Sequence, residues 1–237
     1  MIEVRSVTRR YGKKQHEFLA LDDINFTIKS GASVAIIGKS GSGKSTLMHA
    51  MSGLDRPQVG EVVVDGQDIL KLKQKRVDTF RAEKIGFIFQ SFFLQSTETV
   101  ADNVSLPLEI ANISKKERQK KVKRALEDVD LIDKIKNRAK DLSGGQKQRL
   151  VIARAIVNDP SIIFADEPTG NLDSVTSEKI EDLLFDYNKS KGTTLIIVTH
   201  DDELAAKCDT QIRIKDGKIE SIIEKKNKKT PKKGAAK

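Results

Sequence analysis

A glycine-rich loop that directly follows a short apolar run constrains the fold more than any other stretch of this sequence. The run covers residues 34–37, and the loop "GKSGSGKST" begins at Gly38 and fits the pattern G-x-x-x-x-G-K-[ST]. Gly38, Gly41 and Gly43 let the backbone turn so that successive N–H groups point at phosphate oxygens, and a following helix adds the positive end of its dipole. The sequence therefore predicts a strand, a phosphate-binding loop and a helix in that order, which begins an α/β fold.

The side chains of this loop have separate predicted roles. We expect Lys44 to bridge the β- and γ-phosphates of a nucleotide, the Ser45 hydroxyl to bind Mg²⁺, and Thr46 to hydrogen-bond the α-phosphate. A glycine-rich structural turn is the alternative, and the position between a strand and a helix disfavours it. The other loop residues expected at the phosphates are Lys39, Ser40 and Ser42, with the three glycines.

The stretch "IIFADEP" supplies two carboxylates at the end of a second apolar run, residues 161–166. Asp166 ends this run, where a carboxylate is costly unless it is paired, and Mg²⁺ is the natural partner. Glu167 follows at the carboxyl end of the strand and is predicted to accept a proton from an attacking water. An ordinary acidic pair at a strand end is the alternative, and the phosphate loop makes it the weaker one.

Further polar residues follow other strand-like runs. Ligands of open α/β sheets bind beyond the carboxyl ends of the strands, which places His200, after the run 194–199, near the γ-phosphate. Gln90 ends "IGFIFQ", so its amide could reach Mg²⁺ or the attacking water. Tyr11 lies in "RRYGKK", where its ring could stack on a purine base or simply pack.

The rest of the chain predicts one domain with an insertion. The stretch "IEVRSV" alternates in the way of an edge strand, and "IRIKDGKIESII" reads as a hairpin that turns at Asp216 and Gly217. Ser114 and Glu117 are predicted to form a capping box before an amphipathic helix. Residues 91–157 should be largely helical and form a helical subdomain inside a domain that spans residues 1–223.

Composition limits the classes of function. The sequence has no run of about 20 apolar residues, the length that a membrane-spanning helix needs. Its single cysteine, Cys208, is expected to be buried or incidental. Of the net charge of +9, the last fourteen residues, 224–237, carry seven lysines and one glutamate. This tail is expected to be disordered, and because it holds most of the excess charge, nucleic acid is an unlikely partner.

The order and spacing of these motifs resemble those of the ATP-binding subunit of an ABC transporter. The motifs are the phosphate loop, Gln90, "LSGGQ" before "KQRLVIARAI", "IIFADEP", "GNLD" and His200. Stretches such as "SGLDRPQVGEVVVDGQDI" and "DEPTGNLDS" resemble the branch that holds macrolide-efflux, lipoprotein-releasing and cell-division ATPases. The resemblance implies a phosphate-loop core with a mostly parallel sheet, an N-terminal antiparallel β subdomain and a helical insertion subdomain.

The resemblance also implies how the chain works. Two copies would meet head to tail on binding ATP and Mg²⁺, so that Ser143, Gly144, Gly145 and Gln146 of one copy close over the ATP held by the other. Asp173 of "GNLD" would couple the two sites. Hydrolysis would drive a separate membrane permease, docked beside Gln90, with the chain peripheral on the inner face of the cell membrane. The alternative is a cell-division type of ATPase that moves a membrane protein without carrying cargo.

Overall fold

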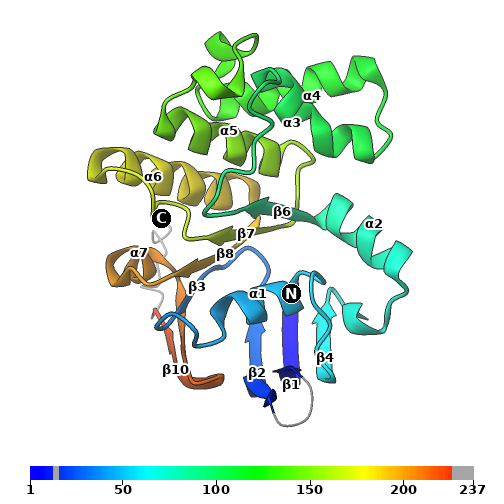
Figure 1. The fold of residues 1–237 in the computed structure, drawn as a ribbon, viewed down its shortest axis with the longest axis vertical. Helices are drawn as coiled ribbons and strands as arrows, with labels where there is room; N and C mark the ends of the chain where they lie inside the picture. The colour runs from blue at the N-terminus through cyan, green and yellow to red at the C-terminus, as the bar shows by residue number, and fades with distance from the viewer. Residues whose placement is uncertain (13–15, 226–237) are drawn as a thin grey trace, which may run out of the picture.

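The computed structural model describes residues 1–12 and 16–225, and two β-sheets form its frame (Figure 1). The antiparallel sheet has the strand order β2-β1-β4-β5. Its first strand, β1, lies between β2 and β4, so the prediction of an edge strand was wrong. Alternation records that one face of a strand is exposed, and it carries no information on whether both edges are paired. The bounds are β1 Ile2–Tyr11, β2 Phe18–Ile28, β4 Val59–Val64 and β5 Gln67–Asp68.

The second sheet is mostly parallel, as predicted, and has the order β10-β9-β3-β8-β7-β6. All its neighbouring strands are parallel except β9 and β10. These two form the predicted hairpin, in which Asp216 and Gly217 both have positive φ, 48° and 75°. The bounds are β3 Ser33–Ile37, β6 Ile85–Ile88, β7 Ile162–Asp166, β8 Thr194–Thr199, β9 Thr210–Lys215 and β10 Lys218–Glu224.

Strand β3 is apolar throughout because both of its faces are covered. Val34 and Ile36 belong to a core shared with the antiparallel sheet and with helix α1, Lys44–Met51. Ala35 and Ile37 belong to a second core, which helices α3, α4, α5 and α6 cover. The phosphate loop therefore starts from a strand that is buried on both faces, and the helix that follows it packs into the first of the two cores.

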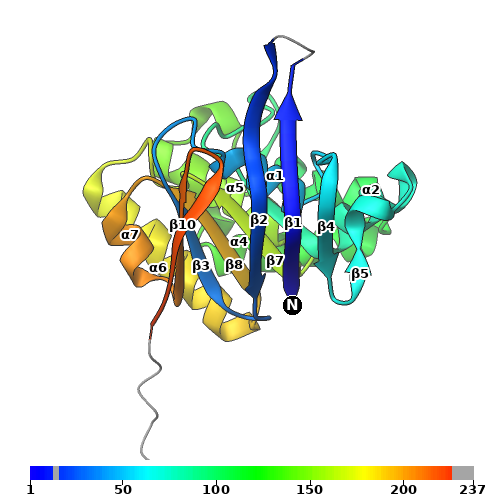
Figure 2. The same cartoon turned by 90° about the horizontal axis from the view of Figure 1, so that it is seen from below.

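The helices lie mainly on the side of the parallel sheet away from β1 and β2 (Figures 1 and 2). Of the predicted capping box at α4, only half forms: Ser114 Oγ accepts the N–H of Glu117 at 3.4 Å, and the reciprocal bond is missing from this described pair. The segment 91–157 contains α3, α4 and α5, as expected for a largely helical insertion. The bounds are α2 Gln74–Lys84, α3 Val100–Ile110, α4 Lys115–Asp128, α5 Gly144–Ile156, α6 Ser174–Lys191 and α7 Asp202–Lys207, with 3₁₀ turns at Ile69–Lys71, Ile132–Lys134 and Ala139–Asp141.

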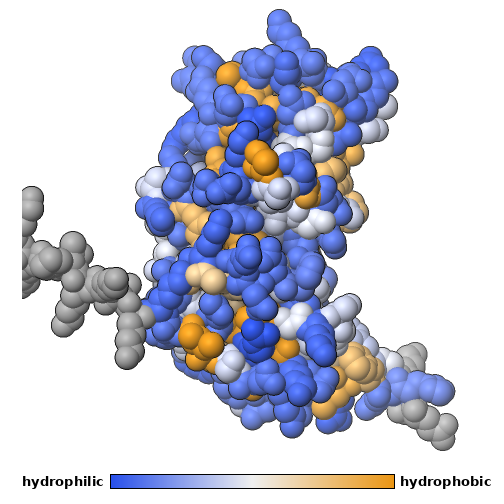
Figure 3. Space-filling view, turned by 90° about the vertical axis from the view of Figure 1, so that its left-hand side faces the viewer, coloured by the Kyte–Doolittle hydropathy of each residue, from blue (hydrophilic) through white to orange (hydrophobic). Residues whose placement is uncertain are grey.

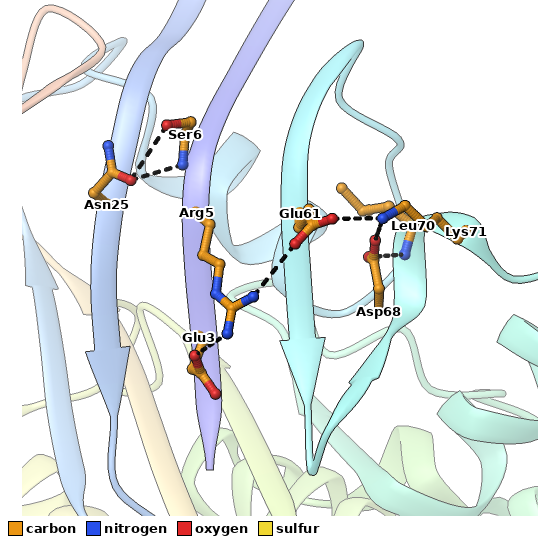
Figure 4. Close-up of polar contacts among 8 residues, drawn as sticks. All are labelled: Glu3, Arg5, Ser6, Asn25, Glu61, Asp68, Leu70 and Lys71. Atoms are coloured by element: carbon orange, nitrogen blue, oxygen red, sulfur yellow. Dashed lines mark hydrogen bonds and ion pairs between the residues drawn. The ribbon is translucent and has the colours of Figure 1, made fainter.

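Charged side chains cover the outer face of the antiparallel sheet (Figure 4). Arg5 on β1 lies 2.6 Å from Glu3 and 3.4 Å from Glu61 on β4, and Glu61 also pairs with Lys71. The intervening residues Ile2 and Val4 point into the core. The strand therefore alternates as far as Arg5, as expected for a sheet with one solvated face, and the alternation breaks at Ser6, where φ is 48° and the register shifts.

Cys208 is fully buried, as expected for a thiol with no chemical role. Burial raises the pKa of this thiol to about 12, so it stays protonated at neutral pH. A protonated, inaccessible thiol is a poor nucleophile.

The surface at the left of Figure 1 is mostly hydrophilic, and its apolar side chains form small separate groups (Figure 3). Within residues 1–12 and 16–225, the helices include none that is long and apolar enough to cross a membrane. The predicted disordered lysine tail lies, apart from its first two residues, outside the described residues.

Candidate nucleotide-binding site

A pocket of about 430 Å³ opens where the strands of the parallel sheet end. It is lined from five separate parts of the chain: the start of β2, the phosphate loop with the start of α1, and the segments that follow β6, β7 and β8. The sequence placed most of these residues at one site, and the structure brings them together. The lining residues are Phe18, Ala20, Ser40, Gly41, Gly43, Lys44, Ser45, Thr46, Gln90, Asp166, Glu167 and His200.

The phosphate loop needs glycine for steric reasons. A Cβ atom at Gly43 would lie 2.5 Å from the carbonyl oxygen of Ala20, and one at Gly38 would lie 2.3 Å from that of Ile214. Gly43 also has a φ of 105° and is the N-cap of α1, where no side chain caps the helix. The first N–H groups of α1 are therefore left to bind an anion.

The cation of the loop is held over the site by the loop itself. Lys44 Nζ donates to the carbonyl oxygens of Gly38 and Lys39, at 2.8 and 3.1 Å. These bonds fix the ammonium group above the N-terminus of α1, which gives the pocket a positive end. The position suits the β- and γ-phosphates of a nucleotide.

Three of the predicted phosphate contacts lie outside the lining of the pocket. The side chain of Lys39 is exposed, whereas Ser42 is buried and its Oγ finds no hydrogen-bond partner among the described residues. The backbone of Ser42 accepts the N–H of Gly217 at 3.0 Å, which ties the loop to the β9–β10 hairpin. A Cβ atom at Gly38 would lie 2.7 Å from Ser42 Oγ, so these two residues of the loop pack closely against each other.

Asp166 is a half-buried carboxylate that no described residue neutralises by an ion pair. Burial, and then the charge of Glu167, raise the pKa of Asp166, while the nearby His49 and Lys44 lower it. Ser45 and Gln90 line the same pocket, so the predicted ligands present oxygen atoms, which Mg²⁺ prefers. No cluster of three or more His, Cys, Asp or Glu side chains suited to a metal occurs in the described parts of the chain. The oxygen donors of Ser45, Gln90 and Asp166 fit Mg²⁺, an ion that also binds phosphate oxygens.

Glu167 is the most constrained residue of the site. Its φ of 47° is left-handed, although it is neither glycine nor asparagine, and its N–H donates to the carbonyl of Val198 at 2.8 Å. One carboxylate oxygen, Oε1, lies 2.7 Å from Nδ1 of His200, and the other, Oε2, accepts the hydroxyl of Thr199 at 3.1 Å. The bond to Glu167, and then its charge, raise the pKa of the His200 imidazole.

The last four residues of "LSGGQ" and Asp173 line a second pocket, which shares none of its described residues with the first. Ser143 caps α5 and forms a full capping box with Gln146. Asp173 caps α6, and hydrogen bonds from Thr176 lower the pKa of its carboxyl. A Cβ atom at Gly145 would lie 2.6 Å from Thr176 Cγ2, and Gly144 also lines this pocket. Within one chain, these residues do not meet the phosphate loop.

The aromatic residue in the pocket is one that the sequence did not single out. Phe18, 58% exposed, lines the pocket and pairs across the sheet with Tyr11. Tyr11 lies outside the lining: its hydroxyl donates to Asp55 at 2.5 Å, and the guanidinium of Arg9 covers its ring at 4.4 Å. No sequence pattern distinguishes a pocket-lining aromatic residue at the start of a strand from an ordinary exposed one. The place of Phe18 in the pocket follows from its pairing with Tyr11, which the structure shows.

A parallel sheet whose strands end at a glycine-rich loop and a half-buried carboxylate places this protein among the phosphate-loop nucleotide-binding proteins. The sequence profile described as ABC transporter matches residues 21–170, well over half of the chain. The chain belongs to the ABC transporter family, as an ATP-binding subunit.

Individual relatives agree with this assignment. The uncharacterized ABC transporter ATP-binding protein YbbA of Escherichia coli is 41% identical over 93% of this chain and 96% of its own length. The macrolide export ATP-binding/permease protein MacB of Hyphomonas neptunium is 42% identical over 92% of this chain, which spans 34% of that longer protein. A solved dimeric structure of the ATP-binding cassette MJ0796, in a post-hydrolysis state bound to ADP and Pi, is also similar. Its sequence is 39% identical, the match covers 94% of this chain and 98% of the MJ0796 chain, and the TM-score is 0.86. MacB is a macrolide-export protein, so the relatives include the macrolide-efflux branch that the sequence predicted.

Proposed function

We propose that this chain hydrolyses ATP, forms a head-to-tail dimer while ATP is bound, and drives a separate membrane permease. The observation that carries the proposal is the pocket itself, in which Lys44 and the start of α1 face Glu167 and His200. A cationic loop, a half-buried carboxylate and a carboxylate bound to an imidazole, all at one edge of a sheet, suit phosphoryl transfer to water.

In this proposal each residue of the pocket has a defined task. Lys44 and the first N–H groups of α1 hold the phosphates and stabilise the charge that develops on them. Ser45, Gln90 and Asp166 would hold Mg²⁺, which supplies charge neutralisation to the β- and γ-phosphate oxygens when bound. Glu167 takes the proton of the attacking water, and His200 holds that water and the γ-phosphate in line.

The separation of the two pockets supports the head-to-tail dimer. Ser143 and Asp173 line one pocket, and the phosphate loop lines the other, so each chain offers two unlike surfaces. A two-fold axis can bring the first pocket of each chain against the second pocket of its partner. MJ0796, of which the dimeric structure is bound to ADP and Pi, is the relative that supports this arrangement.

Replacing Ser143 by Arg tests the dimer. The Ser143→Arg variant should bind ATP as a monomer with nearly normal affinity, because the pocket with Lys44 is untouched. It should not dimerise, since a bulky cation would fill the space of the second pocket. Binding is measured by titration and dimerisation by sedimentation in the Glu167→Gln background. Ser190→Arg, at the far end of α6, is the matched control, and dimerisation of both variants would contradict the proposal.

A groove beside Gln90 supports a permease docking site. Its exposed apolar side chains include Phe93, 70% exposed, and Ile110, 67% exposed. Arg154 Nη1 and Nη2 donate to the carbonyl oxygens of Phe93 and Phe92, at 2.7 and 2.9 Å, which holds the segment after Gln90 against α5. Phe93 has a strained backbone with a φ of 46°, and its ring packs edge-on against that of Phe89 with the centroids 5.6 Å apart. Such a patch next to the site suits a partner that responds to the nucleotide.

The relatives support a permease rather than another partner. The name of MacB pairs an ATP-binding function with a permease in one chain, and this chain matches 34% of that chain. We therefore propose a position peripheral to the inner face of the cell membrane, with residues 1–223 as the ATPase domain, residues 91–157 as its helical subdomain and the tail from 224 outside it. The alternative remains a cell-division type of ATPase that moves its membrane partner without cargo.

Purification from native membranes tests the docking groove. The wild type should carry a membrane protein with it, and Phe93→Asp should lose that protein while it keeps its basal ATPase activity, because the groove is separate from the phosphates. Ile223→Asp, at an exposed apolar position on β10, is the control that should retain the partner. Loss of the partner by the control alone would place the docking site elsewhere. A transport assay with the copurified protein then separates export from movement without cargo.

A further inference from the structure

The carboxylate of Glu167 is held from two sides by groups of very different mobility. His200, on one side, has a side chain that is 73% exposed, and among the described residues its one hydrogen-bond contact is with Glu167. Thr199, on the other side, is 1% exposed and ends strand β8, which pairs with β7 as far as Val198 and with β3 up to Thr199 itself. Its β-branched side chain has little freedom at χ1. Of the two contacts, the one with Thr199 is therefore the fixed one.

The direction of the hydrogen bond at Thr199 follows from its partners. A hydroxyl group has one proton to donate and two lone pairs that accept. The N–H of Asp201 donates to Thr199 Oγ1 at 3.0 Å, so one lone pair is used. The proton of the hydroxyl is then left for Oε2 of Glu167, 3.1 Å away. Oε2 is thereby occupied, and Oε1 is the oxygen that faces the exposed side of the site.

We infer that Thr199 is a positioning residue for hydrolysis: its hydroxyl fixes Oε2 of Glu167, so that Oε1 remains aimed at the attacking water when the His200 imidazole turns toward the γ-phosphate. The inference rests on the proposed function, since it takes Glu167 as the base. Without the Thr199 hydroxyl, the contact with His200 would be the one that remains of these two, and the carboxylate would lose it as soon as His200 moved. Glu167 would then rotate about its side-chain bonds, and a freely rotating base is aligned with water for only part of the time.

The test compares Thr199→Val with Thr199→Ser. Valine keeps the shape and burial of the side chain and removes the hydroxyl, whereas serine keeps the hydroxyl. Loss of a hydrogen bond to a charged group should lower kcat about tenfold to 100-fold in Thr199→Val. The KM for ATP and the dissociation constant of MgADP, measured by titration, should stay within about twofold, because Thr199 contacts neither Lys44 nor the loop. Thr199→Ser should recover most of the wild-type kcat.

Thr194→Val is the matched control. Thr194 begins the same strand, is equally buried, and its Oγ1 accepts the N–H of Gly31 at the end of the sheet away from Glu167. This variant should lower the melting temperature and leave kcat unchanged. If it lowered kcat as much as Thr199→Val, the loss would come from a weakened strand and the inference would be wrong.

A double-mutant cycle separates Thr199 acting through Glu167 from Thr199 acting through the start of α7, where Asp201 lies. Thr199→Val should cost little in the Glu167→Gln background, since the base it positions is already absent. An equal loss in both backgrounds would contradict the inference. The proposed function fails on a different result: if Glu167→Gln alone keeps wild-type turnover, the base is wrongly assigned. If Glu167→Gln is inactive and Thr199→Val is fully active, only the role of Thr199 is lost.

Discussion

The Glu167→Gln variant is expected to form a stable dimer with ATP and Mg²⁺ and to remain a monomer without them. Glutamine keeps the size and shape of the side chain but cannot take a proton from water. Lys44, Ser45 and Ser143 are unchanged, so ATP should still bind and still join two chains. Loss of a positioned general base typically lowers the rate about 10²-fold to 10⁴-fold, which makes hydrolysis slower than the assay.

Size-exclusion chromatography with and without nucleotide measures this dimer, and phosphate release measures the rate. The wild type should hydrolyse its ATP and return to the monomer, and Glu224→Gln, at an exposed carboxylate on β10, should behave like it. A competing mechanism makes His200 the essential group and Glu167 secondary. It predicts that Glu167→Gln retains much of the turnover and traps no dimer, and that outcome would overturn our assignment of the base.

Replacing Lys44 by Ala should abolish tight nucleotide binding. The ammonium group is fixed over the loop by two carbonyl oxygens, and its removal takes away the fixed cation predicted to meet the β- and γ-phosphates. The two charge-assisted hydrogen bonds that the ammonium group is predicted to make with the β- and γ-phosphates contribute about 1.5–3 kcal/mol each. Without them, the affinity for ATP should fall by at least about 100-fold.

Calorimetric titration with ATP measures this loss, and circular dichroism checks that the variant is folded. Lys29→Ala removes an exposed lysine that precedes β3 and serves as the control with unchanged affinity. Near-normal affinity of Lys44→Ala would argue against nucleotide binding at this loop.

The fold could be read from the sequence wherever a pattern has a single physical cause. Residues 34–37, 161–166 and 194–199 are apolar on both faces because helices and a second sheet cover them, and all three form parallel strands. Asp216 and Gly217 turn the predicted hairpin because both tolerate positive φ. The neighbours of β1 were not predictable, since β4 pairs with it from more than fifty residues away and alternation is the same at an edge or in the middle. The capping box at Ser114 forms only in half because the Glu117 side chain does not accept the N–H of Ser114, and the sequence does not determine the rotamer of that side chain.

The site could be predicted because its residues follow strands that end together. Gln90, Asp166 and His200 are far apart in sequence and line one pocket because β6, β7 and β8 are parallel neighbours. The place of Phe18 and the bond from Thr199 to Glu167 depend on side-chain directions that no motif records. Ser143 and Asp173 line a pocket of their own, so within one chain they lie apart from the phosphate loop.

The left-handed backbone at Glu167 and Phe93 has a consequence for how this protein can be stabilised. Residues other than glycine, asparagine and aspartate pay about 1–2 kcal/mol for such a conformation. Glu167 lies in the nucleotide pocket and Phe93 in the groove beside it. Glycine at either position would relieve the backbone, yet it would remove the proposed base or the proposed docking side chain. Under the proposed function, selection for heat resistance alone would therefore favour sequences that fold better and work worse, and at these two positions the chain would give up stability to keep its activity.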